Sequence, residues 1–542
     1  MHPFIKFYFT LAFLVWCIST QAQVDFASSN LPIMLIETEG NAEIPDDPKI
    51  DAQMKLIANG IGETNSINDI ANEYNGKIGI EIRGSSSAAL FPKKGFGFET
   101  RESDDSNNNV SLLGMPTEND WVLHGPYSDK TLIRNALAYL IAAELMDYAP
   151  RVRHIELVLN DEYRGVYLLT EKIKRDKDRV DVSKLNPEDT EGDQLTGGYI
   201  IKVDKSTGSG AGWNSEFSSL GGNRSHSFLY HDPKYEELQD EQIDYIQKYM
   251  FEFESMMDSE NYNDPLTGYP NWIDEDSFMA SFFVNEISKN VDGYRLSTYL
   301  FKDRDSINSR LRSGPVWDFN LAFGNANYCE GETTQGWAYE FNNICLGDKW
   351  NVPFFWEKLY DDLSYRSNIK ETWFDLRTGV LSTASILGIV DSLSNLLSSS
   401  QVRNFEQWPV LGEWVWPNFN VANSYSQEVF YMRNWILQRL EWMDGKIELF
   451  DVDLDIFRED FIVYPNPADQ SINITIPPRT IDSFELLMHD ATGRLIFKRD
   501  YSGLLGSISV DDIDISHLID GVYYYTVLRR GEVAKTGSWM KR

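Results

Sequence analysis

Hydrophobic and polar residues alternate along the first part of the chain in the manner of β-strands. Residues 77–83 place an isoleucine at every second position, and the apolar run 31–36 has the length of a buried strand. Further strands are predicted at 154–159, 165–171 and 198–203. This part of the chain is therefore predicted to be rich in β-structure.

The pattern becomes helical after Tyr235. Apolar residues then recur at intervals of three and four, which predicts helices that include 275–288 and 427–449. Short alternating segments return after residue 459 and predict a small β-sandwich. A strand-rich half followed by a helix-rich half predicts an α+β protein with two lobes and a cleft between them. The expected divisions are 1–22, 23–235 (strand-rich lobe), 236–450 (helix-rich lobe), 451–458 (linker) and 459–542 (sandwich).

Residues 1–22 have the features of a secretory signal peptide. Lys6 precedes an apolar run that is too short to span a membrane, and small residues follow the run. No other run is long and apolar enough to cross a bilayer, so the mature chain is predicted to have no transmembrane segment. After removal of the signal peptide the cysteines are Cys329 and Cys345, and export to an oxidising compartment favours a disulfide between them. A buried pair of free thiols is the alternative.

The charge of the chain excludes several classes of partner. It carries 83 acidic and 49 basic residues, a formal net charge of -34. Such a chain repels the phosphates of nucleic acids and anionic lipid head groups, so binding to nucleic acid or to a membrane surface is not expected.

Two aspartates flank a predicted hairpin in the helical half. Residues 294–301 and 310–316 read as its strands, with a turn near Asp305. Antiparallel pairing about that turn would place Asp292 opposite Asp318. Because facing carboxylates repel each other, the arrangement predicts a hard divalent cation between them, most simply Mg²⁺. The alternative is that both are solvated loop aspartates in a very acidic chain.

Charged residues also occur at core-facing positions of predicted strands. Lys94 is in phase with Phe96, while Glu171 and Lys202 are each in phase with apolar neighbours. Buried charges must be paired, so a Lys–Glu pair is expected among them. The Gly/Ser loop 84–87 before Lys94 could hold phosphates with backbone N–H groups and the lysine charge. The alternative is that the lysine extends to solvent.

Several enzyme classes lack their motifs in this chain. It contains no His-Glu-x-x-His, no phosphate-binding Gly-x-x-x-x-Gly-Lys-Ser/Thr and no Gly-x-Ser-x-Gly. Paired carboxylates also serve glycosidases, and the aromatic residues Tyr294, Trp317 and Trp337 keep a carbohydrate-active enzyme open as an alternative.

A set of short blocks follows one order along the chain. The blocks are Arg83-Gly84-Ser85-Ser86-Ser87, Phe91-Pro92-Lys93-Lys94, Glu171-Lys172-Ile173, Gly198-Tyr199-Ile200-Ile201-Lys202, Asn290-Val291-Asp292-Gly293-Tyr294 and Pro315-Val316-Trp317-Asp318-Phe319-Asn320. In this order they resemble the CotH kinase family, secreted atypical protein kinases named for spore coat protein H, over about residues 31–445.

The resemblance implies a two-lobed, kinase-like fold that binds ATP and Mg²⁺ and phosphorylates Ser or Thr of an extracellular or surface protein. It makes Asp292 and Asp318 the catalytic and metal-binding aspartates and adds Asn320 to the metal site. It also implies nucleotide contacts by a set of residues on the strand-rich side, with Glu171 orienting a lysine: Arg83, Ser85, Lys94, Glu171 and Lys202.

Two positions depart from the kinase pattern. Ser297 stands where an ordinary kinase has asparagine, and Asn320 stands where kinase-type members often have a second aspartate. A catalytically inactive surface adhesion or scaffold protein with the same fold is therefore the alternative function.

The last part of the chain resembles the C-terminal sorting domain of type IX secretion. The matching pieces are Tyr464-Pro465-Asn466-Pro467-Ala468, Asp490-Ala491-Thr492-Gly493-Arg494, Gly521-Val522-Tyr523-Tyr524 and Met540-Lys541-Arg542. This resemblance implies that residues 459–542 engage the type IX secretion machinery and direct the protein out of the cell or to its surface.

Overall fold

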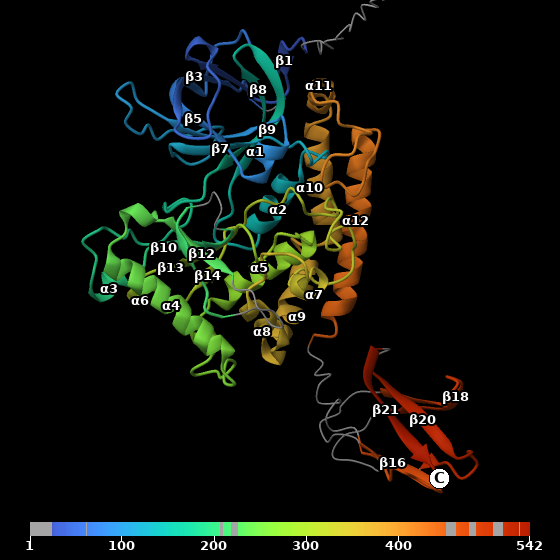
Figure 1. Ribbon diagram of the computed structural model, residues 1–542. Helices are drawn as coiled ribbons and strands as arrows, with labels where there is room; N and C mark the ends of the chain where they lie inside the picture. Colours follow the sequence, from blue (N-terminus) through green and yellow to red (C-terminus); the bar gives the residue numbers. More distant parts are fainter. Residues whose placement is uncertain are drawn as a thin grey trace, which may run out of the picture. The chain divides into compact units, whose positions relative to one another are not determined.

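The computed structural model describes residues 24–60, 62–205, 210–217, 226–450, 462–475, 484–501, 513–529 and 532–542. The predicted signal peptide and linker, at 1–22 and 451–458, lie outside these ranges. The chain is α+β, as predicted, and divides into two compact units. The first comprises residues 1–359 and 373–444, and the second comprises residues 360–372 and 445–542. Figure 1 shows the elements of both units, which are described separately below.

Strands at the start of the first unit close into a barrel, drawn in blue to teal in Figure 1. Around the barrel the strands are β2 (Ile33–Thr38), β3 (Ile50–Ile57), β5 (Tyr74–Arg83), β6 (Gly95–Thr100), β7 (Asp120–His124), β9 (Glu162–Glu171) and β8 (Val152–Leu159). Parallel pairing of β2 with β8 closes the ring. Every strand contributes to one hydrophobic cluster, which includes Ile78 and Ile80 at 0% exposure. The predicted apolar face of residues 77–83 thus forms part of the barrel core.

A second sheet follows the barrel in the same unit. Its strand order is β11 (Gly212–Asn214), β12 (Ser227–Asp232), β10 (Tyr199–Val203), β13 (Thr298–Lys302) and β14 (Arg312–Ser313). Central strand β10 pairs with β12 on one side and β13 on the other. The predicted lobe boundary at residue 235 therefore falls between strands of one sheet, because strands distant in sequence cover both edges of β10.

Helices make up most of the remaining part of this unit. The longer ones are α2 (Arg134–Ala143), α4 (Asp240–Asp258), α5 (Glu275–Ser288), α8 (Phe354–Asp361), α9 (Leu363–Arg377), α10 (Thr383–Leu396), α11 (Ser400–Gln407) and α12 (Tyr425–Ile447). Parts of α8, α9 and α12 belong to the second unit. Short helices are α1 (Ser86–Leu90), α3 (Gly192–Leu195), α6 (Asp305–Asn308) and α7 (Phe341–Ile344). Among the described residues, no helix combines the length and the apolar character needed to cross a membrane.

Helix α2 begins at Arg134, after a turn that Asp129 holds. The Asp129 carboxylate accepts hydrogen bonds from the backbone N–H of Thr131 at 3.1 Å and of Arg134 at 2.9 Å. These bonds hold residues 129–133 in a turn, since an aspartate that bonds to nearby backbone competes with the helix.

Helix α11 is bonded to the outside of the barrel. Arg403 forms an ion pair with Glu156, which is 0% exposed, at 2.7 Å. Asn404 accepts hydrogen bonds from Lys93 Nζ at 2.7 Å and from the backbone N–H of Val166 at 3.1 Å. These contacts fix the orientation of the barrel relative to the helices of this unit.

The second unit contains two antiparallel sheets. One has the order β15 (Ile462–Tyr464), β16 (Ser471–Thr475) and β19 (Ile513–Asp514), and the other β18 (Leu495–Tyr501), β17 (Phe484–His489), β20 (Gly521–Arg529) and β21 (Glu532–Lys541). Both contribute to one hydrophobic cluster that includes Ile472, Leu486 and Trp539. The strand-rich character predicted for this region is confirmed.

A buried ion pair joins α5 to α12. Glu286 and Arg439 are both 0% exposed and lie 2.9 Å apart. Glu286 also accepts hydrogen bonds from Tyr294 Oη and from the backbone N–H groups of Ala338 and Tyr339. Because nearly all its oxygen lone pairs are used, this carboxylate fixes the end of α5 and the segments that follow it.

We predict that Arg439→Met destabilises the first unit by about 3–5 kcal/mol, because it leaves the Glu286 charge buried and uncompensated. Thermal and urea unfolding of the full chain measure the change. Arg433→Met is the matched control on the same helix: Arg433 pairs with Asp391 at the surface, and its loss is expected to cost about 1 kcal/mol or less. Equal effects of the two substitutions would contradict the role of the buried pair.

Candidate functional site

Asp292 lies in the turn that follows α5. The helix ends at Lys289, which adopts a left-handed conformation with φ of 40°. The side chain of Asn290 accepts a hydrogen bond from the backbone N–H of Asp292 at 3.2 Å. The Asp292 carboxylate is 20% exposed and pairs with Arg295, itself 2% exposed, at 2.9 Å. The aspartate is thus held both by backbone and by a buried guanidinium.

Asp318 lies in the loop after β14 and has a φ of 65°. Helix α2 holds this loop: the backbone N–H of Asp318 donates to Tyr139 Oη at 3.1 Å, and that of Phe319 donates to Asn135 Oδ1 at 2.7 Å. The Asn290 side chain donates to the backbone carbonyl of Asp318 at 3.4 Å, which links the two aspartate segments directly.

The predicted hairpin exists, but it does not align the aspartates as expected. Strand β13 begins at Thr298, and the register pairs Leu300 with Ser313 and Phe301 with Arg312. This register is offset by three from the predicted one, and the ladder ends before it reaches Asp292 or Asp318. A helical turn at 305–308 replaces the simple turn, and Pro315 has no N–H with which to extend the pairing.

The two aspartates are nevertheless neighbours. The pKa of Asp318 rises from 3.8 to about 7, because burial disfavours the charged form and because the carboxylates of Asp292 and Asp204 repel it. Burial also raises the pKa of Asp292, although Arg295 and Lys205 oppose the shift. Three carboxylates therefore share one electrostatic environment.

Asp204 is the member of this group that the sequence analysis did not identify. It directly follows β10, is 8% exposed, and accepts hydrogen bonds from Lys202 Nζ at 3.0 Å and from the backbone N–H of Lys205 at 2.9 Å. The available signal was its position at the end of a confidently patterned strand, immediately before a Gly/Ser-rich loop. Lys205 in turn donates to Ser86 Oγ at 3.4 Å.

Basic side chains face these carboxylates. Burial and the charges of Lys202, Arg83 and Lys172 together lower the pKa of His231 to about 3, so all three cations lie near this ring. Arg83 ends β5 and lies over the Trp317 ring at 5.5 Å, next to Asp318. Together with Lys205, these side chains form the basic group. Arg83 and Lys205 interact with Asp318, and Lys202 bonds Asp204. Lys172 joins the group through its proximity to Arg83.

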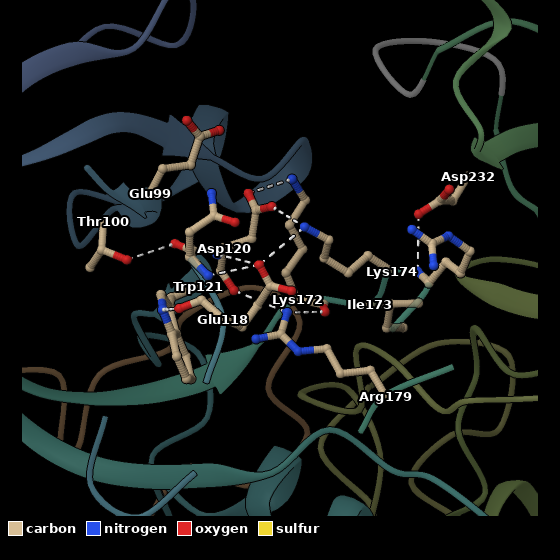
Figure 2. Close-up of polar contacts among 12 residues, drawn as sticks. Glu99, Thr100, Glu118, Asp120, Trp121, Lys172, Ile173, Lys174, Arg179 and Asp232 are labelled. Atoms are coloured by element: carbon tan, nitrogen blue, oxygen red, sulfur yellow. Dashed lines mark hydrogen bonds and ion pairs between the residues drawn. The ribbon is translucent and has the colours of Figure 1, made fainter. Parts of the chain in front are cut away.

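Figure 2 shows the network that holds Lys172. Asp120 accepts hydrogen bonds from Lys172 at 3.2 Å and from Lys174 at 2.8 Å, and Glu118 accepts one from Lys174 at 3.1 Å. Burial alone would raise the pKa of Asp120, but the two lysines outweigh it and lower the pKa to about 2. Asp120 therefore keeps its negative charge beside Lys172, whose own pKa is lowered by burial.

Glu171 is buried as predicted, but its partners are not the predicted lysines. It is 0% exposed, pairs with Arg151 at 3.1 Å, and lies 3.9 Å from Arg179. An arginine supplies a fork of N–H groups, and Arg151 reaches both oxygens of Glu171. The structure thus replaces the predicted Lys–Glu pair with an Arg–Glu pair.

Lys94 also differs from the prediction. Its Nζ donates to the backbone carbonyl of Ala88, and it is Lys93 that is fully buried, at 1% exposure. Period-two phasing fails here because β6 begins only at Gly95. Ser85 is exposed at the start of α1, and Asn320 lies partly buried two residues after Asp318.

The acidic group offers carboxylate oxygens of the kind that a hard divalent cation takes as ligands. Among the described residues, no three His, Cys, Asp or Glu side chains converge closely enough to hold a metal ion by themselves. Magnesium in nucleotide sites is typically bound by one or two carboxylates, with substrate phosphates and water completing the octahedron. Asp318 and Asp292, with raised pKa values, have the excess negative charge that such an ion would offset.

A disulfide closes the segment that follows this loop. Cys329 and Cys345 are bonded, with Cα atoms 5.2 Å apart, which confirms the predicted pairing.

Comparison with protein families assigns both parts of the chain. Residues 80–443 match the model described as CotH kinase protein, which is more than half of the sequence. The chain belongs to the CotH kinase family. Residues 462–538 match a secretion system C-terminal sorting domain. This CotH-family protein is therefore secreted or displayed at the cell surface, and its C-terminal domain engages the secretion machinery.

Other comparisons add little. No curated protein matches the chain. Among solved structures, an alkylpurine DNA glycosylase AlkC of Pseudomonas fluorescens, bound to DNA with an abasic site analog, is 15% identical over 40% of this chain and 70% of that chain. Its TM-score of 0.10 carries no inference.

The raised pKa of Asp318 predicts a pH dependence of stability in the metal-free protein. Between about pH 4 and pH 7 the folded state holds a proton on Asp318 that the unfolded state has lost, so this contribution to stability falls as the pH rises. Asp318→Asn should flatten that slope and, above pH 7, stabilise the fold on the order of 1–2 kcal/mol, since partial exposure reduces the full effect. Asparagine tolerates the left-handed backbone there, whereas alanine would add strain.

Unfolding in EDTA at a series of pH values measures this slope. Asp391→Asn, on an exposed carboxylate that pairs with Arg433, serves as the control and should leave the slope unchanged. Parallel pH profiles for the wild type and Asp318→Asn would show that the pKa of Asp318 is not raised in the folded state.

Proposed function

We propose that this CotH-family protein is a secreted or cell-surface protein kinase that transfers the γ-phosphoryl group of ATP to Ser or Thr of an extracellular protein. The observation that carries the proposal is the meeting of an acidic and a basic group in one place. Phosphoryl transfer depends on positioning and on compensation of phosphate charge, for which both kinds of group are needed. The basic group is Arg83, Lys172, Lys202 and Lys205, and the acidic group is Asp204, Asp292 and Asp318.

The architecture supports a two-lobed reading of the first unit. In this reading the barrel is the smaller lobe, and the second sheet with its helices is the larger one. Arg83 and Lys172 come from the ends of barrel strands, whereas Asp204, Asp292 and Asp318 come from the second sheet and its connections. A site assembled from both parts matches the way kinases bind nucleotide between lobes.

The two predicted catalytic aspartates differ in their surroundings, and this suggests different roles. Asp318 carries the larger charge repulsion, so we assign it, with Asn320, to the metal site. A bound Mg²⁺ would offset charge on the transferred phosphoryl group. Asp292 is held by the buried Arg295 and is positioned to accept the proton of the acceptor hydroxyl. Asp204 bonds the Lys202 ammonium group and thereby orients that cation, and it also holds the backbone N–H of Lys205.

One observation favours a second candidate function. Ser297, in the place of the kinase asparagine, adopts a φ of 48° and lines a small cavity of about 20 Å³ with Asn290 and Trp317. A chain that lacks this metal ligand could keep nucleotide binding and lose transfer, which would make it a binding-only surface protein.

The carbohydrate-active alternative loses most of its support. Tyr294 is 0% exposed and Trp337 8% exposed, so neither can form a sugar platform. Trp317 is partly covered by Arg83.

We predict that Asp318→Asn abolishes Mg²⁺-dependent binding of ATP. The substitution removes a carboxylate ligand from the cation that would offset the charge of the phosphates. Asp292→Asn should lower the rate of phosphoryl transfer about a hundredfold or more, with a smaller effect on ATP affinity. Calorimetric titration with ATP, with and without Mg²⁺, and transfer from radiolabelled ATP to a generic Ser/Thr acceptor measure both effects. Asp391→Asn is the control.

Equal transfer by the wild type and Asp318→Asn would show that the site is elsewhere. ATP binding without transfer by the wild type would favour the binding-only function, and absence of both would remove the kinase assignment.

We also predict that deletion of residues 459–542 leaves the first unit folded but retains the protein in the periplasm, since the sorting domain is lost. Surface biotinylation of intact cells, compared with periplasmic extracts, measures the distribution. Normal surface levels of the truncated protein would contradict the sorting role.

A further inference from the structure

Large aromatic side chains are exposed on the segment that connects α11 to α12. Trp414 is 58% exposed, Trp416 is 39% exposed and Phe419 is 52% exposed. Phe430 of α12 is 63% exposed, and Phe419 contacts its neighbour Tyr431 with ring centroids 6.4 Å apart. Scattered exposed apolar residues are normal, but several on one short segment mark an interaction surface. We call Trp414, Trp416 and Phe419 the aromatic patch.

Internal hydrogen bonds hold the segment that carries the patch. Trp414 Nε1 donates to the backbone carbonyl of Asn418 at 3.0 Å. Asn418 is 2% exposed and donates to the carbonyl of Ser128 at 2.7 Å and to Asn325 Oδ1 at 2.8 Å. The backbone N–H of Phe419 donates to the carbonyl of Asn325 at 2.8 Å. The rings are therefore presented by a fixed backbone, which reduces the entropy lost on binding.

The aromatic patch continues into the candidate site. Trp416 stacks on Tyr328 with centroids 6.1 Å apart and an interplanar angle of 11°. The loop that carries Tyr328 packs on the Asp292 segment so closely that a Cβ added at Gly331 would lie 2.5 Å from Cγ1 of Val291. Burial raises the pKa of Tyr328, and the Asp292 charge raises it further, which agrees with this proximity.

Polar groups around the aromatic patch are used inside the protein. Asn420 Nδ2 donates to Glu428 Oε2 at 3.0 Å, and the backbone N–H of Ala422 donates to Glu428 Oε1 at 2.9 Å. The Nδ2 of Asn418 is bonded as described above, and its Oδ1 is buried without a partner among the described residues. A carbohydrate would need such groups for its hydroxyls, whereas apolar side chains of a polypeptide need only the ring faces. The chemistry of this surface therefore favours a polypeptide.

We propose that the aromatic patch is the docking surface for the acceptor protein and selects segments that carry an aromatic or large aliphatic residue near the acceptor Ser or Thr. The acceptor role rests on the proposed kinase function, but the binding of apolar peptide segments does not. Rigid aromatic residues in a continuous surface are the usual anchors of protein interfaces.

Binding can be tested without catalysis. Fluorescence polarisation measures the affinity of the full-length mature protein for labelled Ser-containing peptides that differ at one flanking position, which is Gly, Asp, Asn, Leu or Trp. We expect the Leu and Trp peptides to bind about tenfold more tightly than the Gly peptide, a difference of about 1.4 kcal/mol. Phe419→Ser and Trp416→Ser should each remove this preference.

Matched controls separate docking from loss of folding. Phe251→Ser changes a 44% exposed phenylalanine on α4 and should keep the preference for apolar peptides. Phe430→Ser changes a 63% exposed phenylalanine of α12, next in sequence to the Tyr431 that contacts Phe419, and should weaken the preference without touching the Tyr328 stack. Thermal unfolding of each variant verifies that the fold is retained.

Several outcomes would overturn the proposal. These are equal affinity for the apolar and Gly peptides, a preference that persists in folded patch variants, binding of neutral oligosaccharides in place of peptides, and a wild-type dimer that the patch variants convert to monomer.

Kinetics distinguish this proposal from the kinase assignment. Phe419→Ser should raise KM for the Leu peptide about tenfold and leave kcat unchanged, since the ring does not contact the reacting groups. Patch-dependent binding without phosphorylation by the wild type would remove the kinase function and leave the docking surface. Phosphorylation with a KM that is unchanged in the patch variants would retain the kinase function and remove the docking surface.

Discussion

Carboxylates that share a largely buried recess repel one another unless positive charge is near. Asp204, Asp292 and Asp318 are in this situation, and burial together with repulsion from the other two carboxylates raises the pKa of Asp318 to about 7. A fold that served stability alone would separate these side chains or replace them with apolar ones. Perturbed carboxylates clustered in this way are typical of functional sites.

The scaffold around the site resists this repulsion with neutral and paired groups. Asn290 bonds both aspartate segments, α2 fixes the Asp318 loop through Tyr139 and Asn135, and Arg295 is the only one of these groups that offsets charge directly. Below them the Glu286–Arg439 pair anchors the end of α5 to α12. The site is thus positioned by contacts that remain when charges in it change, which suits a centre that binds and releases a charged substrate.

The sequence predicted strands and buried positions better than it predicted which side chains form ion pairs with one another. Alternation at 77–83 correctly gave a barrel strand and its core face, and burial of Glu171 followed from its phase. The ion-pair partners of Glu171 could not be predicted in this way, because Arg151 and Arg179 come near it only when the strands around it fold.

The aspartates also show that a local sequence pattern does not identify which residues bring two side chains together. Asp292 and Asp318 are neighbours, but through Asn290 and α2 and not through the predicted ladder, which local pattern alone cannot distinguish. Asp204 escaped notice because a residue at the end of a strand shows its role only when the strand's neighbours are known.

Because the chain as a whole is strongly negative, attraction of a phosphate would depend on the basic group. A protein with a formal charge of -34 repels ATP at long range, so nucleotide binding here would depend on local attraction. Salt at physiological strength screens exposed charges beyond about 8 Å, whereas groups inside a partly buried site are screened much less. Arg83, Lys172, Lys202 and Lys205 would then dominate the field that a bound phosphate experiences, while the acidic surface mainly keeps the exported protein soluble. The same reasoning explains why docking of an acceptor would use aromatic contacts: they attract a polypeptide whatever its charge and leave the charged groups to the chemistry.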